Sequence, residues 1–283
     1  MSSYEIPENL EQAIKLADDG DWRLLAGGTD FYPQLGDKPV DFNIIDINQI
    51  QELKGISREA EFWRIGATTT WSELLETQLP SAFDGLKLAA REVGSEQIQN
   101  AASVAGNLCN ASPAADSVPP FLSLDAIVEL QSIEGTRQMP VSEFIEGNRR
   151  TGIRQNEILT AVLVPTDRDQ ASSHFIKLGT RKYLVISISM VSALLRKSAD
   201  GLIDLACISV GSCSEVAQRL PQLEADLIGK SVKTDLGDYV MPEYLSGLAP
   251  INDVRASGDY RMHASEELVR RVLSECEFGK NES

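Results

Sequence analysis

The most informative segment of this 283-residue chain runs from Ser103 to Asp116 and reads SVAGNLCNASPAAD. Its small side chains let the backbone approach a ligand closely, and its serine and asparagine side chains offer hydrogen-bond donors. Asp116 is a candidate acceptor for a ribose hydroxyl or a ring N–H group. A buried loop of small residues is the alternative interpretation, so this segment alone leaves both a ligand site and a structural loop open.

The residues around this segment lack a regular hydrophobic period. From Ser95 to Asp125 the chain is rich in small residues and is punctuated by asparagine and proline. A long aperiodic stretch inside a compact domain is unusual unless it is functional. We therefore predict an irregular, ligand-binding loop over residues 95–125.

A second candidate segment, Leu24 to Asp30, reads LLAGGTD, so that a predicted strand runs directly into a glycine pair. Glycines allow a tight turn and expose consecutive backbone N–H groups to an anion, and Thr29 adds a hydroxyl donor. A plain turn is the alternative interpretation, and the Rossmann fingerprint G-x-G-x-x-G is absent. Taken together, the two donor-rich segments predict a site for the two ends of one elongated phosphate ligand.

Apolar spacing predicts α+β structure throughout the chain. Helices are predicted over residues 10–17, 70–75, 82–93, 215–227 and 264–276, the second of them opened by the capping box Thr70-Trp71-Ser72-Glu73. Strands are predicted over residues 22–26, 43–47, 63–67, 126–131, 158–164, 175–178, 186–197 and 203–210. The change to strands followed by helices places a domain boundary near residue 170.

The charge balance and the apolar runs exclude several classes of protein. The chain has 26 Lys and Arg against 42 Asp and Glu, a formal net charge of −16, which disfavours binding to nucleic-acid phosphates. No apolar run approaches the roughly 20 residues of a membrane-spanning helix. The first residues also lack the basic and then apolar layout of a signal peptide. We therefore predict no nucleic-acid partner, no membrane span and a cytoplasmic location.

Cysteine and histidine usage argues against a metal site and against catalysis by a side chain. Cys109, Cys207, Cys213 and Cys276 form neither a C-x-x-C pair nor an iron–sulfur run. The two histidines have no second histidine at ligand spacing. We therefore predict no metal ligands and no catalytic side chain, and we expect a bound organic cofactor to carry the chemistry.

The two candidate segments resemble the cofactor loops of the molybdenum hydroxylase flavoproteins. In the medium chain of bacterial carbon monoxide dehydrogenase and the FAD domain of xanthine dehydrogenase, an A-G-G-x-[ST/D] loop and a T-[IV]-G-G-N-[LI]-x-x-x-[SA]-P-x-[AS]-D loop bind FAD. This chain carries both in the same order, and further matches continue to Val254–Arg261. The resemblance implies a two-subdomain PCMH-type FAD-binding domain, similar to vanillyl-alcohol oxidase, over residues 1–170, with subdomains of about 1–56 and 57–170. A smaller α+β domain like the carbon monoxide dehydrogenase flavoprotein C-terminal domain would follow over residues 171–283.

The resemblance also implies which residues bind FAD. Residues 23–30 would surround the pyrophosphate, and the second segment would complete the phosphate and flavin cradle. Asp116 would lie on the ribityl or flavin side, Leu159 would pack on the adenine, and Lys177 would lie near the flavin. The predicted cofactor-binding set is Arg23, Leu24, Leu25, Ala26, Gly27, Gly28, Thr29, Asp30, Phe31, Ala102, Ser103, Gly106, Asn107, Asn110, Ala115, Asp116, Leu159 and Lys177.

In the terms of this family, the chain is one link in an electron relay. Electrons from a substrate oxidised at molybdenum in a large molybdopterin-containing subunit cross [2Fe–2S] centres in a small subunit. They then reach FAD in the medium subunit, which delivers them to NAD, oxygen or a quinone-linked acceptor. The resemblance therefore implies a flavoprotein oxidoreductase subunit of a heteromeric complex.

Two other classes of protein stay open. A stand-alone FAD-dependent oxidase or dehydrogenase of the same fold would need its own substrate pocket and acid–base residues, and the C-terminal third shows no obvious set. A non-catalytic assembly subunit that has lost FAD is the second alternative, and its only support is Ala105. The family usually has glycine at this position, where a methyl group would crowd the pyrophosphate, although the neighbouring Gly106 is kept.

Overall fold

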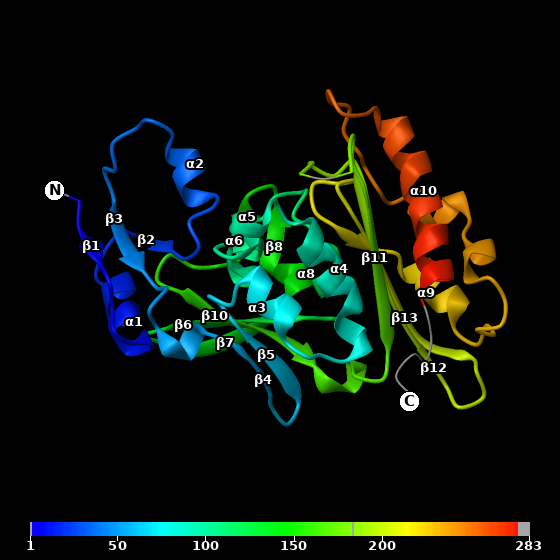
Figure 1. Cartoon of the computed structure of the whole chain (residues 1–283), viewed down its shortest axis with the longest axis horizontal. Helices are drawn as coiled ribbons and strands as arrows, with labels where there is room; N and C mark the ends of the chain where they lie inside the picture. The colour runs from blue at the N-terminus through cyan, green and yellow to red at the C-terminus, as the bar shows by residue number, and fades with distance from the viewer. Residues whose placement is uncertain (1, 183, 277–283) are drawn as a thin grey trace.

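The computed structural model describes residues 2–182 and 184–276, which form three sheet-based parts that follow one another along the molecule (Figure 1). A small sheet with two helices comes first in the chain. A five-stranded sheet with several short helices lies in the middle, and a four-stranded sheet beside one long helix comes last. The predicted α+β architecture is confirmed.

The first part is a three-stranded parallel sheet in the order β1-β3-β2. Its elements are β1 (Tyr4–Glu5), α1 (Leu10–Asp18), β2 (Trp22–Leu25), α2 (Phe31–Leu35) and β3 (Asn43–Asp46). The helix α1 starts where the side chain of Asn9 accepts a hydrogen bond from the Gln12 N–H group, and it buries Ala13 and Ala17. The predicted helix and both predicted strands are therefore confirmed, and β2 directs the chain into the glycine segment.

The second part is an antiparallel sheet in the order β4-β5-β10-β6-β7. Its strands are β4 (Ile56–Arg58), β5 (Phe62–Gly66), β6 (Ile127–Ser132), β7 (Gly135–Pro140) and β10 (Ile158–Pro165). The central strand β10 is buried from Ile158 to Val164, which explains its unbroken apolar sequence. A short hairpin of β8 (Ile145–Gly147) and β9 (Arg150–Thr151) follows α8 (Val141–Phe144) beside this sheet.

Helices α3 (Trp71–Glu76) and α4 (Asp84–Glu92) lie where the hydrophobic spacing predicts them. The capping box is present, because the Thr70 hydroxyl accepts from the Glu73 N–H group while the Glu73 carboxylate accepts from the Thr70 N–H group. The predicted helix over residues 82–93 is confirmed except at its start, because Ser81–Phe83 form the 3₁₀ helix η2.

The prediction of an irregular loop over residues 95–125 is wrong. Three short helices lie in this stretch, namely α5 (Glu96–Gln99), α6 (Val104–Asn110) and α7 (Val118–Ser123). All six residues of α7 are buried, so no polar face produces the 3.6-residue period. Residues of α6 either enter the core or face a cavity, and their small side chains hide the helix from a search for periodicity. The second candidate segment is therefore a helix and the turn that follows it.

The third part is an antiparallel sheet in the order β11-β12-β13-β14, covered on both faces. Its strands are β11 (Ser172–Leu178), β12 (Ser189–Lys197), β13 (Ile203–Gly211) and β14 (Gln218–Arg219), and its helices are α9 (Pro221–Leu227) and α10 (Gly258–Glu275). Figure 1 shows α4 of the middle part on one side of this sheet and α10 on the other. This double covering explains why Ser189–Leu195 is buried without alternation.

Three boundaries in this part differ from the prediction. The strand predicted from residue 186 begins at Ser189. The helix predicted from residue 215 begins at Pro221, because Gln218 and Arg219 pair with β13. The last helix begins at Gly258, where the Ser257 hydroxyl caps it. The prediction placed its start at residue 264, because the polar residues of the first two turns conceal the apolar face.

Two negative findings apply to residues 2–182 and 184–276. No helix in these residues is long and apolar enough to cross a membrane. No group of three or more histidine, cysteine, aspartate or glutamate side chains in them is placed to hold a metal ion.

Arg219 joins the middle and C-terminal parts through a partly buried ion-pair network. Its guanidinium lies 2.7 Å from an Asp125 carboxylate oxygen and 2.5 Å from a Glu224 carboxylate oxygen, and it donates to the carbonyl of Leu122. Arg168 contacts the same aspartate at 2.8 Å. Hydrogen bonding to Glu224 and the neighbouring carboxylates raise the pKa of Arg219, against the opposing effect of its own burial. The network thus links β14 to the C-terminal end of α7.

Replacing Arg219 should therefore destabilise the fold. We expect Arg219→Ala to lower the free energy of unfolding by about 3 kcal/mol, because it leaves the largely buried Glu224 carboxylate without its ion-pair partner. The matched control is Arg271→Ala, which removes an exposed pair with Glu267 and should change stability by less than about 0.5 kcal/mol. Urea unfolding of the three proteins measures both effects, and equal stability of the two variants would contradict the assigned role.

Candidate functional site

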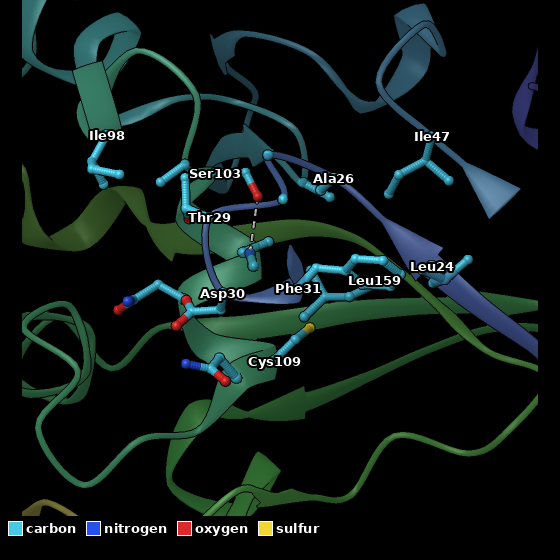
Figure 2. A pocket seen from close by; sticks show the side chains of 18 of the residues that line it. Leu24, Ala26, Thr29, Asp30, Phe31, Ile47, Ile98, Ser103, Cys109 and Leu159 are labelled. Carbon is cyan, nitrogen blue, oxygen red and sulfur yellow. Dashed lines mark hydrogen bonds between the residues drawn. The ribbon is translucent and has the colours of Figure 1, made fainter. Parts of the chain in front are cut away.

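A cavity of about 380 Å³ lies between the first part of the chain and the middle part (Figure 2). One wall is the segment that joins β2 to α2, and another is α6 with the turn before it. Thirteen predicted cofactor residues line this cavity: Leu24, Ala26, Gly27, Gly28, Thr29, Asp30, Phe31, Ala102, Ser103, Gly106, Asn107, Asn110 and Leu159. The structure thus brings together the two segments that the sequence singles out.

The glycine segment is packed directly against the backbone that enters α6. A Cβ atom built on Gly27 would lie 1.9 Å from the Ala101 carbonyl oxygen, so no side chain fits there. Gly28 has φ of +73°, a left-handed conformation that favours glycine. On the other side, the Asn48 amide donates to the Ala26 carbonyl at 2.9 Å. These contacts hold the segment in place, with its backbone facing the cavity.

The second wall is fixed by Ser103, whose hydroxyl accepts from the Gly106 N–H group at 3.1 Å. A Cβ atom on Gly106 would lie 2.7 Å from that hydroxyl. The Ser117 hydroxyl donates to the Asn107 side-chain oxygen at 2.6 Å, which leaves the Asn107 amide hydrogens for other acceptors. Only 3% of the surface of Ala105 is exposed, so its methyl group is largely enclosed by protein.

Five residues of the predicted set do not line this cavity, and for Arg23 and Leu25 the reason is that side chains alternate along β2. Leu24 faces the cavity, so its neighbours Arg23 and Leu25 point to the other face of the sheet. Leu25 is buried in the core, and the guanidinium of Arg23 lies 3.7 Å from the centre of the Phe42 ring. The side chains of these two predicted positions therefore point away from the cavity, while residues 24 and 26–30 line it.

A second cavity of about 450 Å³ adjoins the first, and Asp30, Asn107 and Asn110 line both. The remaining predicted residues, Ala115, Asp116 and Lys177, lie here. The Lys177 ammonium is 2.9 Å from an Asp116 carboxylate oxygen, and the Ser187 hydroxyl donates to the other oxygen at 3.1 Å. Burial raises the pKa of Asp116 above that of an ordinary aspartate, while Lys177 and Ser187 act in the opposite direction. Asp116 and Lys177 therefore form an ion pair, which their spacing in the sequence did not indicate.

Several lining residues were missed by the sequence reasoning. They are Gln34, Ile47, Ala67, Val93, Ile98, Cys109 and Ile153, together with Ala105, which was considered only as a departure from the family pattern. Most are apolar residues at the ends of helices and strands, where nothing in the sequence separates a cavity wall from the core. Gln34 carried no signal, because it belongs to no spacing pattern with a second polar residue. Cys109 lies inside the Ser103–Asp116 segment, but it was considered only as a cysteine without metal-ligand spacing.

The arrangement suits a long ligand with an anionic middle and apolar ends. The walls of the first cavity combine backbone groups of two glycine-containing segments with aliphatic side chains such as Leu24, Ile98 and Leu159 (Figure 2). Backbone N–H groups in such turns bind phosphate oxygens, and aliphatic walls pack against planar rings. The described residues that line the two cavities include no histidine. The donors and apolar walls of the site are suited to binding and orienting such a ligand.

Comparison with known protein families decides what this ligand is. The family model described as the FAD binding domain in molybdopterin dehydrogenase matches residues 1–167. The model described as the CO dehydrogenase flavoprotein C-terminal domain matches residues 174–276. The chain belongs to the FAD-binding subunits of the molybdenum hydroxylases. This flavoprotein subunit thus has FAD as its cofactor, and the predicted resemblance and fold class are confirmed.

Individual relatives match the FAD subunit over almost its whole length. It is 31% identical to the xanthine dehydrogenase FAD-binding subunit of Escherichia coli O157:H7, covering 97% of this chain and 96% of that one. It is 29% identical to the nicotinate dehydrogenase FAD-subunit of Eubacterium barkeri, covering 100% of both chains. Among solved structures, carbon monoxide dehydrogenase from Hydrogenophaga pseudoflava matches with a TM-score of 0.86 and 25% identity, covering 97% of this chain and 96% of that chain.

Adding one methyl group at Gly27 tests the contact between the two walls. We expect Gly27→Ala to weaken FAD binding by about 1–3 kcal/mol, because the new Cβ pushes the glycine segment away from Ala101. The control is Gly247→Ala, whose added Cβ would meet its first neighbour only at 3.9 Å. Titration of the deflavinated proteins with FAD gives both dissociation constants, and unchanged affinity in Gly27→Ala would disprove the assignment.

Cys109 offers a chemical probe of the same cavity. It is exposed within the cavity, whereas Cys207, Cys213 and Cys276 are buried. Desolvation by the cavity walls raises the pKa of the Cys109 thiol to about 12, so labelling is best done at alkaline pH, where more thiolate forms. We expect iodoacetamide to modify Cys109 in the FAD-free protein and FAD to slow this reaction at least about tenfold, as measured by peptide mass spectrometry. Equal labelling with and without FAD would place the cofactor elsewhere.

Proposed function

We propose that this chain is the electron-transferring FAD subunit of a multi-subunit molybdenum hydroxylase. A large molybdopterin-containing subunit would oxidise the substrate, and a small subunit would pass the electrons through its [2Fe–2S] centres. The chain would accept these electrons and deliver them to an external acceptor, which is NAD, oxygen or a quinone-linked carrier. The cytoplasmic location of the complex stays a prediction from the sequence.

The observation that carries this proposal is the composite cavity formed by Gly27–Thr29 and Ser103–Asn107 in a chain that aligns end to end with relatives named as FAD subunits. Two further relatives are the carbon monoxide dehydrogenase medium chain of Hydrogenophaga pseudoflava and subunit alpha of the 6-hydroxypseudooxynicotine dehydrogenase complex of Paenarthrobacter nicotinovorans. Both names describe parts of larger assemblies. The proposal extends this organisation to the present chain.

The residues of the chain would act by holding and insulating the cofactor. Backbone N–H groups of Gly27–Thr29 and the polar groups at Ser103 and Asn107 would hold the pyrophosphate, while Leu159 would pack beside the adenine. When bound, FAD accepts electrons and releases them singly or in pairs. The Asp116–Lys177 pair would fix a charged wall beside the flavin end, since both line the second cavity.

The alternatives gain no support from the geometry. A stand-alone oxidase needs acid–base side chains that face a substrate. At the described cavities, the buried carboxylate of Asp116 and the buried ammonium of Lys177 already form an ion pair with each other. The alternative of a non-catalytic assembly subunit depended on Ala105, whose methyl group was expected to crowd the pyrophosphate. That residue is almost fully enclosed by protein, and a cavity of about 380 Å³ is present beside it.

Electron delivery from a partner tests the proposal. The chain is co-expressed with the proposed large and small subunits, and the purified complex is mixed anaerobically with the substrate of the large subunit. We expect the visible absorption band of the flavin to bleach after the iron–sulfur centres are reduced, as followed by stopped-flow spectroscopy. A chain whose flavin is reduced by substrate without any partner would instead be a stand-alone oxidase, and a chain that never binds flavin would be an assembly subunit.

A further inference from the structure

Asn110, the last residue of α6, is held by two side chains from separate elements. Its side-chain oxygen Oδ1 accepts a hydrogen bond from Arg149 Nη1 at 2.8 Å and from Gln34 Nε2 at 3.2 Å. Gln34 lies on α2 in the first part of the chain, and Arg149 lies in the turn between β8 and β9 in the middle part. Since Asn110 lines both cavities, this three-residue contact lies where the two cavities meet.

The chemistry of arginine fixes which way the Asn110 amide faces. A guanidinium can only donate hydrogen bonds, so the atom that meets Arg149 must be the amide oxygen and not the amide nitrogen. Nδ2 of Asn110 has no hydrogen-bond partner within residues 2–182 and 184–276, nor is it among the buried atoms without a partner. Its two N–H donors are therefore available to a ligand in the cavity.

The backbone at Arg149 shows how this geometry is held. Arg149 has φ of +55° and Ala111, which ends α6, has φ of +45°, both left-handed conformations that are unusual without glycine. The Arg149 N–H group donates to the Ala111 carbonyl at 2.8 Å, so the hairpin turn is joined directly to the end of α6. The guanidinium thus starts from a backbone position that is fixed relative to Asn110.

We propose that Arg149 is a positioning residue for FAD: it turns the Asn110 amide so that its N–H donors face the cofactor. The inference rests on FAD occupying the cavity described above. Gln34 supports the same orientation from the opposite wall, because it donates to the same oxygen. Arg149 also lines the second cavity, and in this proposal it acts on FAD through Asn110 rather than by direct contact.

The test is a double-mutant cycle on FAD affinity, measured by titrating the deflavinated full-length chain with FAD. Losing an oriented amide donor to a charged oxygen should weaken binding about tenfold in Asn110→Ala, and Arg149→Ala should approach the same loss. Because Arg149 works only through Asn110, the double variant should bind no more weakly than Asn110→Ala alone. Asn110→Asp retains an acceptor for Arg149 but has no N–H donor, so it should also lose at least about tenfold.

Controls separate positioning from folding. Arg150→Ala alters the neighbouring arginine, which donates to the Glu146 carbonyl, and it should leave FAD affinity within about twofold. Arg149→Gly removes the side chain while easing the left-handed backbone, so it should keep the unfolding midpoint of the FAD-free protein and still lose affinity. A further tenfold loss on adding Arg149→Ala to Asn110→Ala would overturn the inference by showing direct contact, as would wild-type affinity in Arg149→Gly. Failure of the unaltered chain to bind FAD would instead refute the proposed function.

Discussion

The close approach of Gly27 to the Ala101 carbonyl is the constraint on which the cofactor site depends. With no side chain at this position, the segment after β2 lies directly against the turn that opens α6, and the two backbones form opposite walls of one cavity. Two further contacts hold these walls in place. Asn48 holds the first wall from the outside, and Ser103 fixes the turn of the second. A side chain at Gly27 would push these walls apart and weaken the site proposed for the pyrophosphate.

This construction explains how a chain with a net charge of −16 can hold an anionic cofactor. Exposed charges are screened over a Debye length of about 8 Å at physiological ionic strength, so the acidic surface contributes little inside the cavity. Hydrogen bonds to a charged oxygen contribute about 1.5–3 kcal/mol each, and several neutral donors from two backbone segments can offset the remaining repulsion. The one buried ammonium group at the adjoining cavity, Lys177 among the described residues, is balanced by Asp116.

Much of this site could be predicted from sequence because glycines and small polar residues mark positions where backbone approaches a ligand. Local sequence patterns predict three features that the structure contains: the strand before Gly27, the capping box at Thr70 and the buried strand β10. Helix α7 was missed because complete burial removes the amphipathic pattern. The Gln34–Asn110–Arg149 contact could not be predicted either. Its members are 76 and 39 positions apart in the sequence, and only the packing of α2 and the β8–β9 hairpin on α6 brings them together.

The central claim is that two backbone segments hold the pyrophosphate of FAD, and comparing FAD with riboflavin tests it most directly. Riboflavin carries the same ring system but lacks the pyrophosphate and the adenosine. Calorimetric titration of the deflavinated full-length chain should show one FAD bound per chain, with riboflavin binding at least about 100-fold more weakly, a difference of about 2.8 kcal/mol. Equal affinity for the two flavins would contradict the account, because it would mean that the walls formed around Gly27 and Ser103 do not hold the phosphates.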